Sequence, residues 1–449
     1  MPYIPLSEKD RTRILEAIGA GSVEDLLTAL PAASRVKGPL DLPAGLTEQE
    51  LSLHVKELGR RSSTVHEYSS FLGAGAYNHY IPSVVGHLAS RSEFYTAYTP
   101  YQPEISQGTL QAMFEYQTLV CQLTGMDVAN ASLYDGASAT AEAVLMARRL
   151  TGRRKVVLSS ALHPEYRQTV HTYLSGTGDH VVEAAFCTEA GTTPAGYVQN
   201  ACDDTTACVV VQSPNFFGAI EEIEEIAAVA HAKKALLIVV VAETVSLGLL
   251  KGPGESGCDI VVGENQSFGN ALNFGGPYLG FMATKTEFIR QMPGRIIGQS
   301  VDREGRRAYC LTLATREQHI RRERATSNIC TNQGLCALAA AIHMASLGSA
   351  GLRKLATLNL SKAGYLKGRL AGIEGVRAAF TAPTFNEFVV DVGRDPAPVL
   401  KKLLKKRIIG GLALKRFYPA LEGHILVAAT EMNARGDLDR FADELAAAL

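Results

Sequence analysis

Residues 207–213 read ACVVVQS and residues 235–242 read ALLIVVVA, with the helical-type segment AIEEIEEIAAVAHAKK at residues 219–234 between them. Valine-rich runs that do not alternate with polar residues are typical of strands buried on both faces. Similar runs occur at residues 155–160, 180–186, 258–264 and 278–284, and helical segments separate several of them. The pattern predicts an α/β fold in which helices cover both faces of a mostly parallel sheet.

The segments on either side of this core have a different character. Three short segments place a hydroxyl three residues before an acid, the capping-box pattern found at the N-terminus of helices. They are SEKD, SVED and TEQE, which begin at Ser7, Ser22 and Thr47. Residues 69–106 are rich in tyrosine, glycine and proline, which favours an ordered loop or arm. The sequence predicts three parts: a helical segment with this arm at 1–106, a large α/β domain at 107–331 and a smaller α+β domain at 332–449.

Composition excludes several classes of protein. The chain has 44 lysine and arginine residues against 45 aspartate and glutamate residues, so it has no global field that would attract nucleic acid or an anionic membrane. The strongly apolar run at 235–242 is far shorter than the roughly 20 residues that span a bilayer. The eight cysteines show no C-x-x-C and no metal-binding spacing. We therefore expect no nucleic-acid or membrane partner, no metal, reduced thiols and a cytoplasmic location.

Three positions in the predicted sheet could carry chemistry. Residues 135–140, DGASAT, place small and hydroxyl side chains before an apolar helix, where backbone N–H groups bind anions, although an ordinary helix cap would look the same. Glu243 ends a buried strand, and His163 follows another. Because ligands of parallel sheets bind beyond the carboxyl ends of the strands, both are candidates, and a solvated carboxylate or a structural histidine is the alternative.

A fourth candidate is the run YTAYTPYQPEISQG at residues 95–108. Tyrosines bury area while keeping a polar group, so the run could line a pocket or an interface, or form a well-packed arm. Its candidate side chains are Tyr95, Tyr98, Tyr101, Gln102, Glu104, Ser106 and Gln107.

Several long phrases resemble one known family. FLGAGAYNHYIP (71–82), YTAYTPYQPEISQGTLQAMFEYQTLV (95–120) and REQHIRRERATSNICTNQ (316–333) are similar to the P-protein of the glycine cleavage system, and most similar to subunit 1 of its split form. The resemblance runs from about Ser7 to the C-terminus. It implies a fold-type-I pyridoxal-phosphate enzyme, with a large domain around a seven-stranded sheet and a smaller C-terminal domain.

The resemblance also implies roles for the candidate residues. Asp135, Gly136, Ala137 and Ser138 correspond to the cradle of the cofactor phosphate. His163 corresponds to the residue that stacks on the pyridine ring, and Glu243 to an aspartate that pairs with the pyridine nitrogen. The longer glutamate departs from the family pattern and would crowd a bound ring.

Gln266 is the decisive departure. In the catalytic half of the family a lysine stands at this position, before a glycine-rich stretch that ends in Gly-Pro, and here the turn reads NQSF with Gly275-Gly276-Pro277 at the same spacing. A glutamine amide is not a nucleophilic amine, so it cannot hold the cofactor covalently. Lys251 and Lys285 are poorly placed along the sequence to replace this lysine.

The resemblance therefore implies a subunit that needs a partner. The complex decarboxylates glycine on pyridoxal phosphate, bound mainly by subunit 2 (beta), and transfers the aminomethyl group to the lipoyl group of H-protein. The tyrosine-rich arm would help to shape the partner's site. Two alternatives are a purely structural or regulatory subunit, and a self-sufficient enzyme that uses Lys251 or Lys285.

Overall fold

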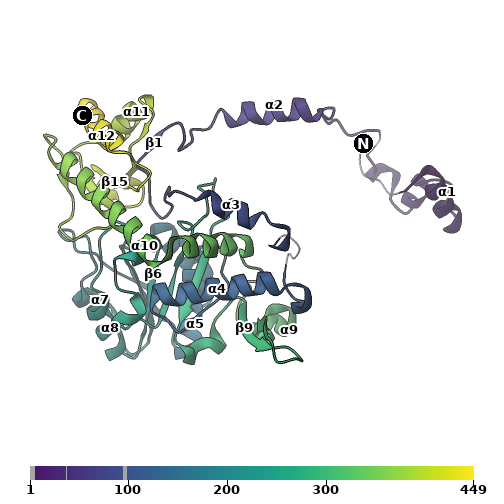
Figure 1. Ribbon diagram of the computed structural model, residues 1–449, viewed down its shortest axis with the longest axis horizontal. Coiled ribbons are helices and arrows are strands. Elements are labelled where there is room, and N and C mark those ends of the chain that lie inside the picture. Colours follow the sequence, from purple (N-terminus) through teal and green to yellow (C-terminus); the bar gives the residue numbers. More distant parts are fainter. Residues whose placement is uncertain (1–5, 37, 95–98) are drawn as a thin grey trace. The chain divides into compact units, whose positions relative to one another are not determined.

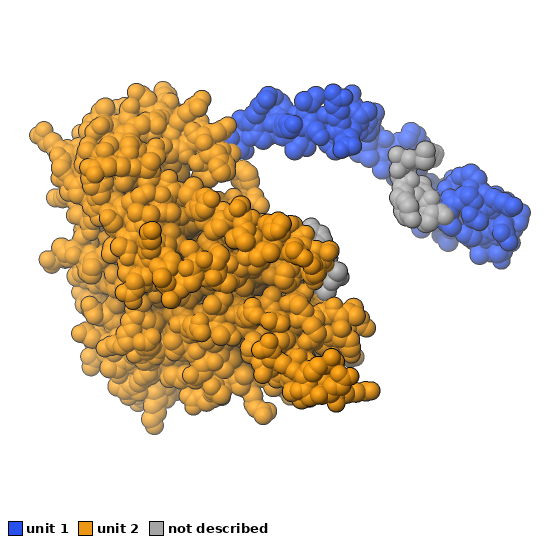
Figure 2. Space-filling view, viewed as in Figure 1, with its two compact units in different colours: residues 1–63 blue, residues 64–449 orange. Residues whose placement is uncertain are grey.

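The structure, a computed structural model, describes residues 6–36, 38–94 and 99–449. It divides into two compact units, residues 1–63 and residues 64–449 (Figure 2). The first unit contains α1 (Glu8–Ala17) and α2 (Glu48–Gly59), which begin with the capping boxes predicted at Ser7 and Thr47. The prediction of an α-helix after Ser22 is wrong. Only a four-residue 3-10 turn, Glu24–Leu27, forms there.

A seven-stranded sheet forms the centre of the second unit, in the order β2-β8-β7-β6-β5-β3-β4. β8 runs antiparallel to both of its neighbours, and the other pairs are parallel, which confirms the predicted α/β class. The strands are β2 (Val128–Ala129), β3 (Lys155–Ser159), β4 (His180–Ala184), β5 (Thr206–Gln212), β6 (Leu236–Val241), β7 (Ile260–Glu264) and β8 (Gly280–Thr284).

Helices cover both faces of this sheet because alternate strand residues point to opposite sides. Val209, Val211 and Val239 pack in one core with α4 (Gln107–Thr124), α7 (Ala195–Ala201), α8 (Ile223–Ala232) and the start of α10 (Gly334–Ala371). Val210 and Ile238 pack in a second core with α5 (Gly136–Thr151) and α6 (Pro164–Leu174). The antiparallel pair β9 (Ile296–Val301) and β10 (Arg307–Thr312) lies beside α4, and α3 (Ser83–Ala89) and α9 (Gln318–Arg321) are short.

A second, four-stranded antiparallel sheet forms the small domain, in the order β11-β12-β15-β14. Its strands are β11 (Arg377–Ala378), β12 (Glu387–Asp391), β14 (Leu412–Ala413) and β15 (His424–Ala428), and its helices are α11 (Pro396–Lys405) and α12 (Arg435–Ala448). Beside them, β1 (Ser69–Ser70) pairs in parallel with β13 (Ile408–Ile409).

The long helix α10 joins the two domains (Figure 1). It is kinked at Gly348; Cys336 to Met344 contribute to the core of the large sheet, and Ala363 to Leu370 to the core of the small domain. Among the described residues α10 is the helix whose length and composition would suffice to cross a membrane. It packs against α3, α4 and α12, as a core helix of a globular protein does. The boundaries of the three parts inferred from the sequence stay a prediction.

Phe71 anchors the segment that follows β1 in the small domain. Its N–H donates to the carbonyl of Ile409 (2.8 Å), and its carbonyl accepts the N–H of Ala428 (2.9 Å). Its ring is fully buried and stacks on Phe441 with centroids 4.2 Å apart. Phe71 therefore fixes the start of the segment that continues towards the large sheet.

Replacing Phe71 by alanine should therefore destabilise the protein. Deleting a buried phenylalanine ring typically costs about 3–5 kcal/mol of unfolding free energy. The matched control is Leu72→Ala at the neighbouring exposed position, which should change stability by no more than about 0.5 kcal/mol. Urea unfolding followed by circular dichroism measures both, and equal shifts would contradict the anchor.

Candidate functional site

The candidate residues meet at the carboxyl edge of the large sheet. His163 follows β3 and begins α6, and Glu243 follows β6. Gln266 lies two residues beyond β7, and Asp135 caps the start of α5. His163, Glu243 and Gln266 are buried. The structure thus brings together the residues that the sequence placed at one edge of the sheet.

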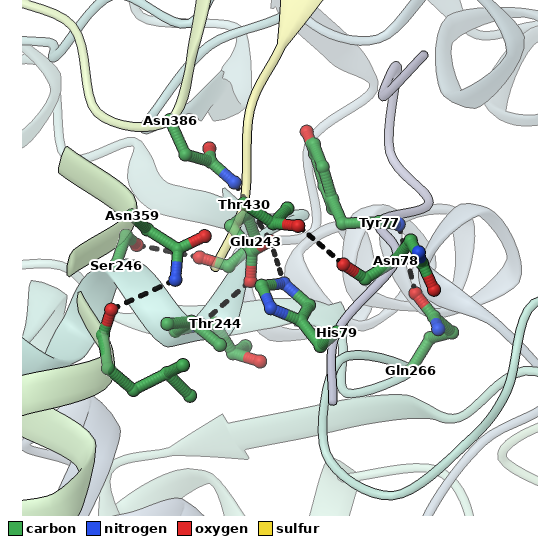
Figure 3. Close-up of polar contacts among 12 residues, drawn as sticks. Tyr77, Asn78, His79, Glu243, Thr244, Ser246, Gln266, Asn359, Asn386 and Thr430 are labelled. Carbon is green, nitrogen blue, oxygen red and sulfur yellow. Dashed lines mark hydrogen bonds and ion pairs between the residues drawn. The ribbon is translucent and has the colours of Figure 1, made fainter. Parts of the chain in front are cut away.

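The chain's own segment from Ala74 to Tyr80 runs between these residues (Figure 3). The N–H of Tyr77 donates to Oε1 of Gln266 (3.1 Å), and Nε2 of Gln266 donates to the carbonyl of Asn270 (2.6 Å). Both ends of the glutamine amide are therefore used inside the chain. Gln266 therefore holds this segment in place.

Glu243 binds the imidazole of His79. Nε2 of His79 lies 2.9 Å from Oε2 of Glu243 (Figure 3). Nδ1 lies 2.9 Å from Oε2 of Glu431, which follows β15 of the small domain. Burial alone would lower the pKa of His79. The two carboxylates outweigh burial and raise this pKa to about 10, so His79 is a buried cation at neutral pH.

His163 is also engaged by the segment. Its Nε2 lies 2.9 Å from the carbonyl oxygen of Ala74, and its ring stacks on Tyr166 with centroids 4.7 Å apart. Gly75 has φ +91°, and a Cβ there would lie 3.1 Å from the His163 ring, so this approach requires glycine. Burial lowers the pKa of His163, which is therefore neutral.

The first turn of α5 is occupied by a carboxyl group of the chain. Asp135 caps the helix by accepting the N–H of Ser138 (2.7 Å), and the N–H of Gly136 donates to Oε2 of Glu264 (3.0 Å). Oε1 of Glu264 accepts the N–H groups of Gln266 (3.1 Å) and Leu279 (2.6 Å). Burial raises the pKa of Glu264 to about 8, although these N–H groups act to lower it.

A second glutamate ties the segment to the small domain. Oε2 of Glu387, the first residue of β12, accepts the hydroxyl of Tyr77 (2.9 Å), and Oε1 accepts the N–H of Ala74 (2.6 Å). Burial raises the pKa of Glu387 to about 7. Both domains therefore hold the segment through buried polar groups.

The other candidates lie away from this cluster. Tyr101, Gln102 and Glu104 are exposed, whereas Ser106 is buried and the amide of Gln107 bonds the backbone of Tyr309 on β10. Tyr95 and Tyr98 lie outside the described residues. Ala137, which remains near the cluster, is half-buried in the first turn of α5, and its methyl side chain makes no hydrogen bond.

Neither alternative lysine reaches the cluster. The ammonium of Lys251 pairs with Glu224 (2.7 Å), and both side chains are largely exposed. Lys285 pairs with Asp259 (2.5 Å), which precedes β7, so it lies at the amino edge of the parallel strands, opposite Gln266. Within the described ranges, no group of three or more histidine, cysteine or acidic side chains could hold a metal ion.

Comparison with known proteins gives consistent results. Residues 1–445 match the family described as "Glycine cleavage system P-protein". The chain is 52% identical over 98% of both chains to "Probable glycine dehydrogenase (decarboxylating) subunit 1" of Desulfitobacterium hafniense, and 50% identical over the full length of both chains to the protein of the same name from Desulforamulus reducens.

A solved structure of glycine decarboxylase (P-protein) of the glycine cleavage system, in inhibitor-bound form, superimposes with a TM-score of 0.91 at 42% identity over all of both chains. The chain belongs to the P-protein family. A sphingosine-1-phosphate lyase from Burkholderia pseudomallei is 18% identical, covers 93% of this chain and 94% of its own, and has a TM-score of 0.64. At that identity it shows the fold alone, which is the fold-type-I class expected from the sequence.

This P-protein chain does not fit a pyridoxal phosphate of its own. Gln266 supplies no amine, and His79 already binds the carboxylate that would face a pyridine nitrogen. Ala74 covers His163, and Glu264 takes the N–H of Gly136 where a phosphate would sit. The positions implied by the resemblance are present, and the chain's own groups contact each of them.

Sequence reasoning missed five residues of this cluster, namely Tyr77, His79, Glu264, Glu387 and Glu431. Glu264 carried the same signal as Glu243, since each is an acid at the end of a buried strand. His79 and Tyr77 lay within the quoted phrase FLGAGAYNHYIP, but their partners are far away in the sequence. Glu431 showed no local signal.

The charge on His79 should make stability depend on pH. The folded chain keeps this proton between pH 6.5 and about 10, whereas the unfolded chain releases it, so the stabilisation is complete below pH 6.5 and is lost as pH rises towards 10. We expect the urea midpoint to fall more steeply between pH 6.5 and 9.5 in the wild type than in His79→Gln. Parallel decreases in the two proteins would contradict a cationic His79.

Proposed function

We propose that this chain is the lysine-free alpha subunit of a split glycine decarboxylase and that it works only together with a lysine-bearing subunit 2. The observation that carries the proposal is Gln266, because a chain about half identical over its full length to proteins named subunit 1 lacks the one side chain that could bind the cofactor covalently. We also propose that the enzyme acts in the cytoplasm, which the free cysteines support.

The chemistry would then take place on the partner. Pyridoxal phosphate held by subunit 2 supplies the electron sink for decarboxylation of glycine, and the lipoyl group of H-protein accepts the aminomethyl group. This chain contributes a rigid scaffold. Buried contacts of the segment from Ala74 to Tyr80 with both domains fix the sheet edge and the neighbouring surface.

The exposed part of the tyrosine-rich arm is the part that can face the partner. Tyr101, Gln102 and Glu104 are free to line the partner's site, and we extend this role to Tyr95 and Tyr98 on the sequence alone. Ser106 and Gln107 fix the arm to the large domain. Ser106 is buried, and the amide of Gln107 hydrogen-bonds the backbone of β10. An arm of this kind acts by orienting groups and excluding water.

The isolated chain should not form a Schiff base at a defined site. We expect borohydride reduction in the presence of pyridoxal phosphate, followed by peptide mass spectrometry, to give no stoichiometric pyridoxyl-lysine. Subunit 2 treated in parallel is the positive control and should be labelled at one lysine. Stoichiometric labelling of Lys251 or Lys285 would favour the self-sufficient enzyme instead.

Complementation tests the proposed function directly. Each purified subunit alone, supplied with lipoylated H-protein and pyridoxal phosphate, should release no CO2 from glycine, and the mixture should restore release. The two chains should also elute as one complex, with an interface above the roughly 2,000 Å² typical of obligate contacts. Turnover by this chain alone would refute the assignment.

A further inference from the structure

A cavity of about 630 Å³ lies beside the kink in α10. It is lined by α4, by the two 3-10 turns that follow β6 (Thr244–Gly248 and Pro253–Ser256), by the turn after β7 and by both halves of α10. The described residues that line it lie outside the buried cluster at the edge of the sheet. Small-molecule sites are concave, mostly apolar and roughly 300–1,000 Å³ in volume, so the cavity has the size of a binding site.

Gly348 opens the cavity by interrupting α10. Its φ of +61° and ψ of 178° are not helical, so α10 consists of two helical halves on either side of it. A Cβ added to Gly348 would meet no heavy atom within 4 Å, so the positive φ, and not a lack of space, favours glycine here. Met344 and Leu347 from the first half and Leu352 from the second half all line the cavity. The kink therefore creates a hollow that a straight helix would not leave.

Apolar side chains from α4, from the turn after β7 and from α10 form much of the wall. Phe268 and Met344 are buried, whereas Leu119, Leu123 and Leu347 are half-buried. These three leucines pack against the core of the large sheet and also line the cavity, so part of their apolar surface remains in contact with water. Removing apolar surface from water is favourable, and the wall therefore favours an apolar ligand.

The charged side chains of the wall favour an anion. Arg353, on the second half of α10, is exposed, and its guanidinium makes no ion pair within the described ranges. Lys251 also lines the cavity and pairs with Glu224 at 2.7 Å, but both side chains are largely exposed, and water weakens such a pair. Glu255 is the one acid among the described lining residues. Two cations and one acid leave the wall with an excess of one positive charge.

We propose that this cavity binds a small carboxylic acid with an apolar tail. The tail packs against Phe268, Met344 and the leucines of the wall, and the carboxylate pairs with Arg353. A single carboxylate matches the excess of one positive charge, and ion pairs between arginine and carboxylate are among the stronger polar contacts. We take a small molecule as the occupant because the wall is concave and comes from several parts of one chain. A covering protein becomes an outcome of the test.

Phe268 connects the cavity with the turn that carries Gln266. Its N–H donates to the carbonyl of Asn265 (3.1 Å), and its ring contacts His343 of α10 edge-on, with centroids 6.0 Å apart. A ligand in the cavity therefore contacts this turn and both halves of the helix that joins the two domains. Because a ligand that binds only the folded chain stabilises it, occupancy should raise the midpoint of thermal unfolding.

The test titrates the isolated full-length chain with sodium octanoate by isothermal titration calorimetry. We expect one octanoate per chain, and about 15-fold weaker binding of hexanoate, because burying each methylene contributes a factor of about four. Octanamide has the same tail without the charge and should bind at least tenfold more weakly than octanoate. The ¹³C-methyl signal of Met344, assigned from its loss in Met344→Leu, should shift and reach saturation at the same octanoate concentration, which locates the site.

Two variants and two matched controls separate the tail from the carboxylate. Leu347→Trp fills the cavity and should weaken octanoate binding at least tenfold. Arg353→Gln should weaken octanoate binding at least tenfold and leave octanamide binding unchanged, because it removes only the charge. Lys354→Gln and Leu358→Trp alter exposed residues of the same helix outside the cavity and should leave both affinities unchanged. Circular dichroism checks folding, and the exposed Arg353 keeps the test decisive if Leu347→Trp does not fold.

Several results would overturn the proposal. They are no binding of octanoate, equal affinities for octanoate and octanamide, and wild-type affinity in Leu347→Trp or Arg353→Gln. If added subunit 2 displaces octanoate from the wild-type chain, a protein covers the cavity and the proposal is wrong; octanoate that stays bound in the complex supports it. These titrations involve no turnover of glycine, so their failure leaves the proposed function intact.

Discussion

The structure depends on one buried cation held between two carboxylates from different domains. His79 lies between Glu243, at the edge of the large sheet, and Glu431, in the small domain, at 2.9 Å from each. Removing one partner of a buried ion pair strongly destabilises the folded protein, because the remaining charge stays buried without compensation. Each of these three groups therefore depends on the other two. This requirement fixes the path of the segment from Ala74 to Tyr80, and through it the position of the small domain on the large one.

The same principle applies to the other buried polar groups at the edge of the large sheet. Each candidate polar group at the sheet edge has a partner from the chain: an imidazolium for Glu243, a carbonyl for His163, a carboxyl group for the N–H of Gly136, and a backbone N–H and carbonyl for the amide of Gln266. Buried polar groups need such partners whether or not the site is catalytic. The polar groups at this sheet edge are thus satisfied internally.

Local patterns predicted the sheet, most of its helices and the position of Glu243, because valine runs and strand ends are local signals. They failed at Ser22, where the hydroxyl-acid spacing is present but only a 3-10 turn forms. They could not identify the pairing of His79 with Glu431, which are 352 residues apart, because it depends on how the domains pack. The interpretation of Gln266 as a replacement for a lysine came from resemblance to a family, because composition and spacing alone do not distinguish this glutamine from any other.

The most direct measurement of the central claim is the protonation state of His79. In the chain labelled with ¹⁵N-histidine, with the signal assigned from its loss in His79→Gln, we predict that both ring nitrogens of His79 still carry protons at pH 8, because two carboxylates raise its pKa to about 10. A His79 that titrates near pH 6.5, or that has one bare ring nitrogen at pH 8, would show that the chain does not compensate Glu243 and Glu431 with its own cation.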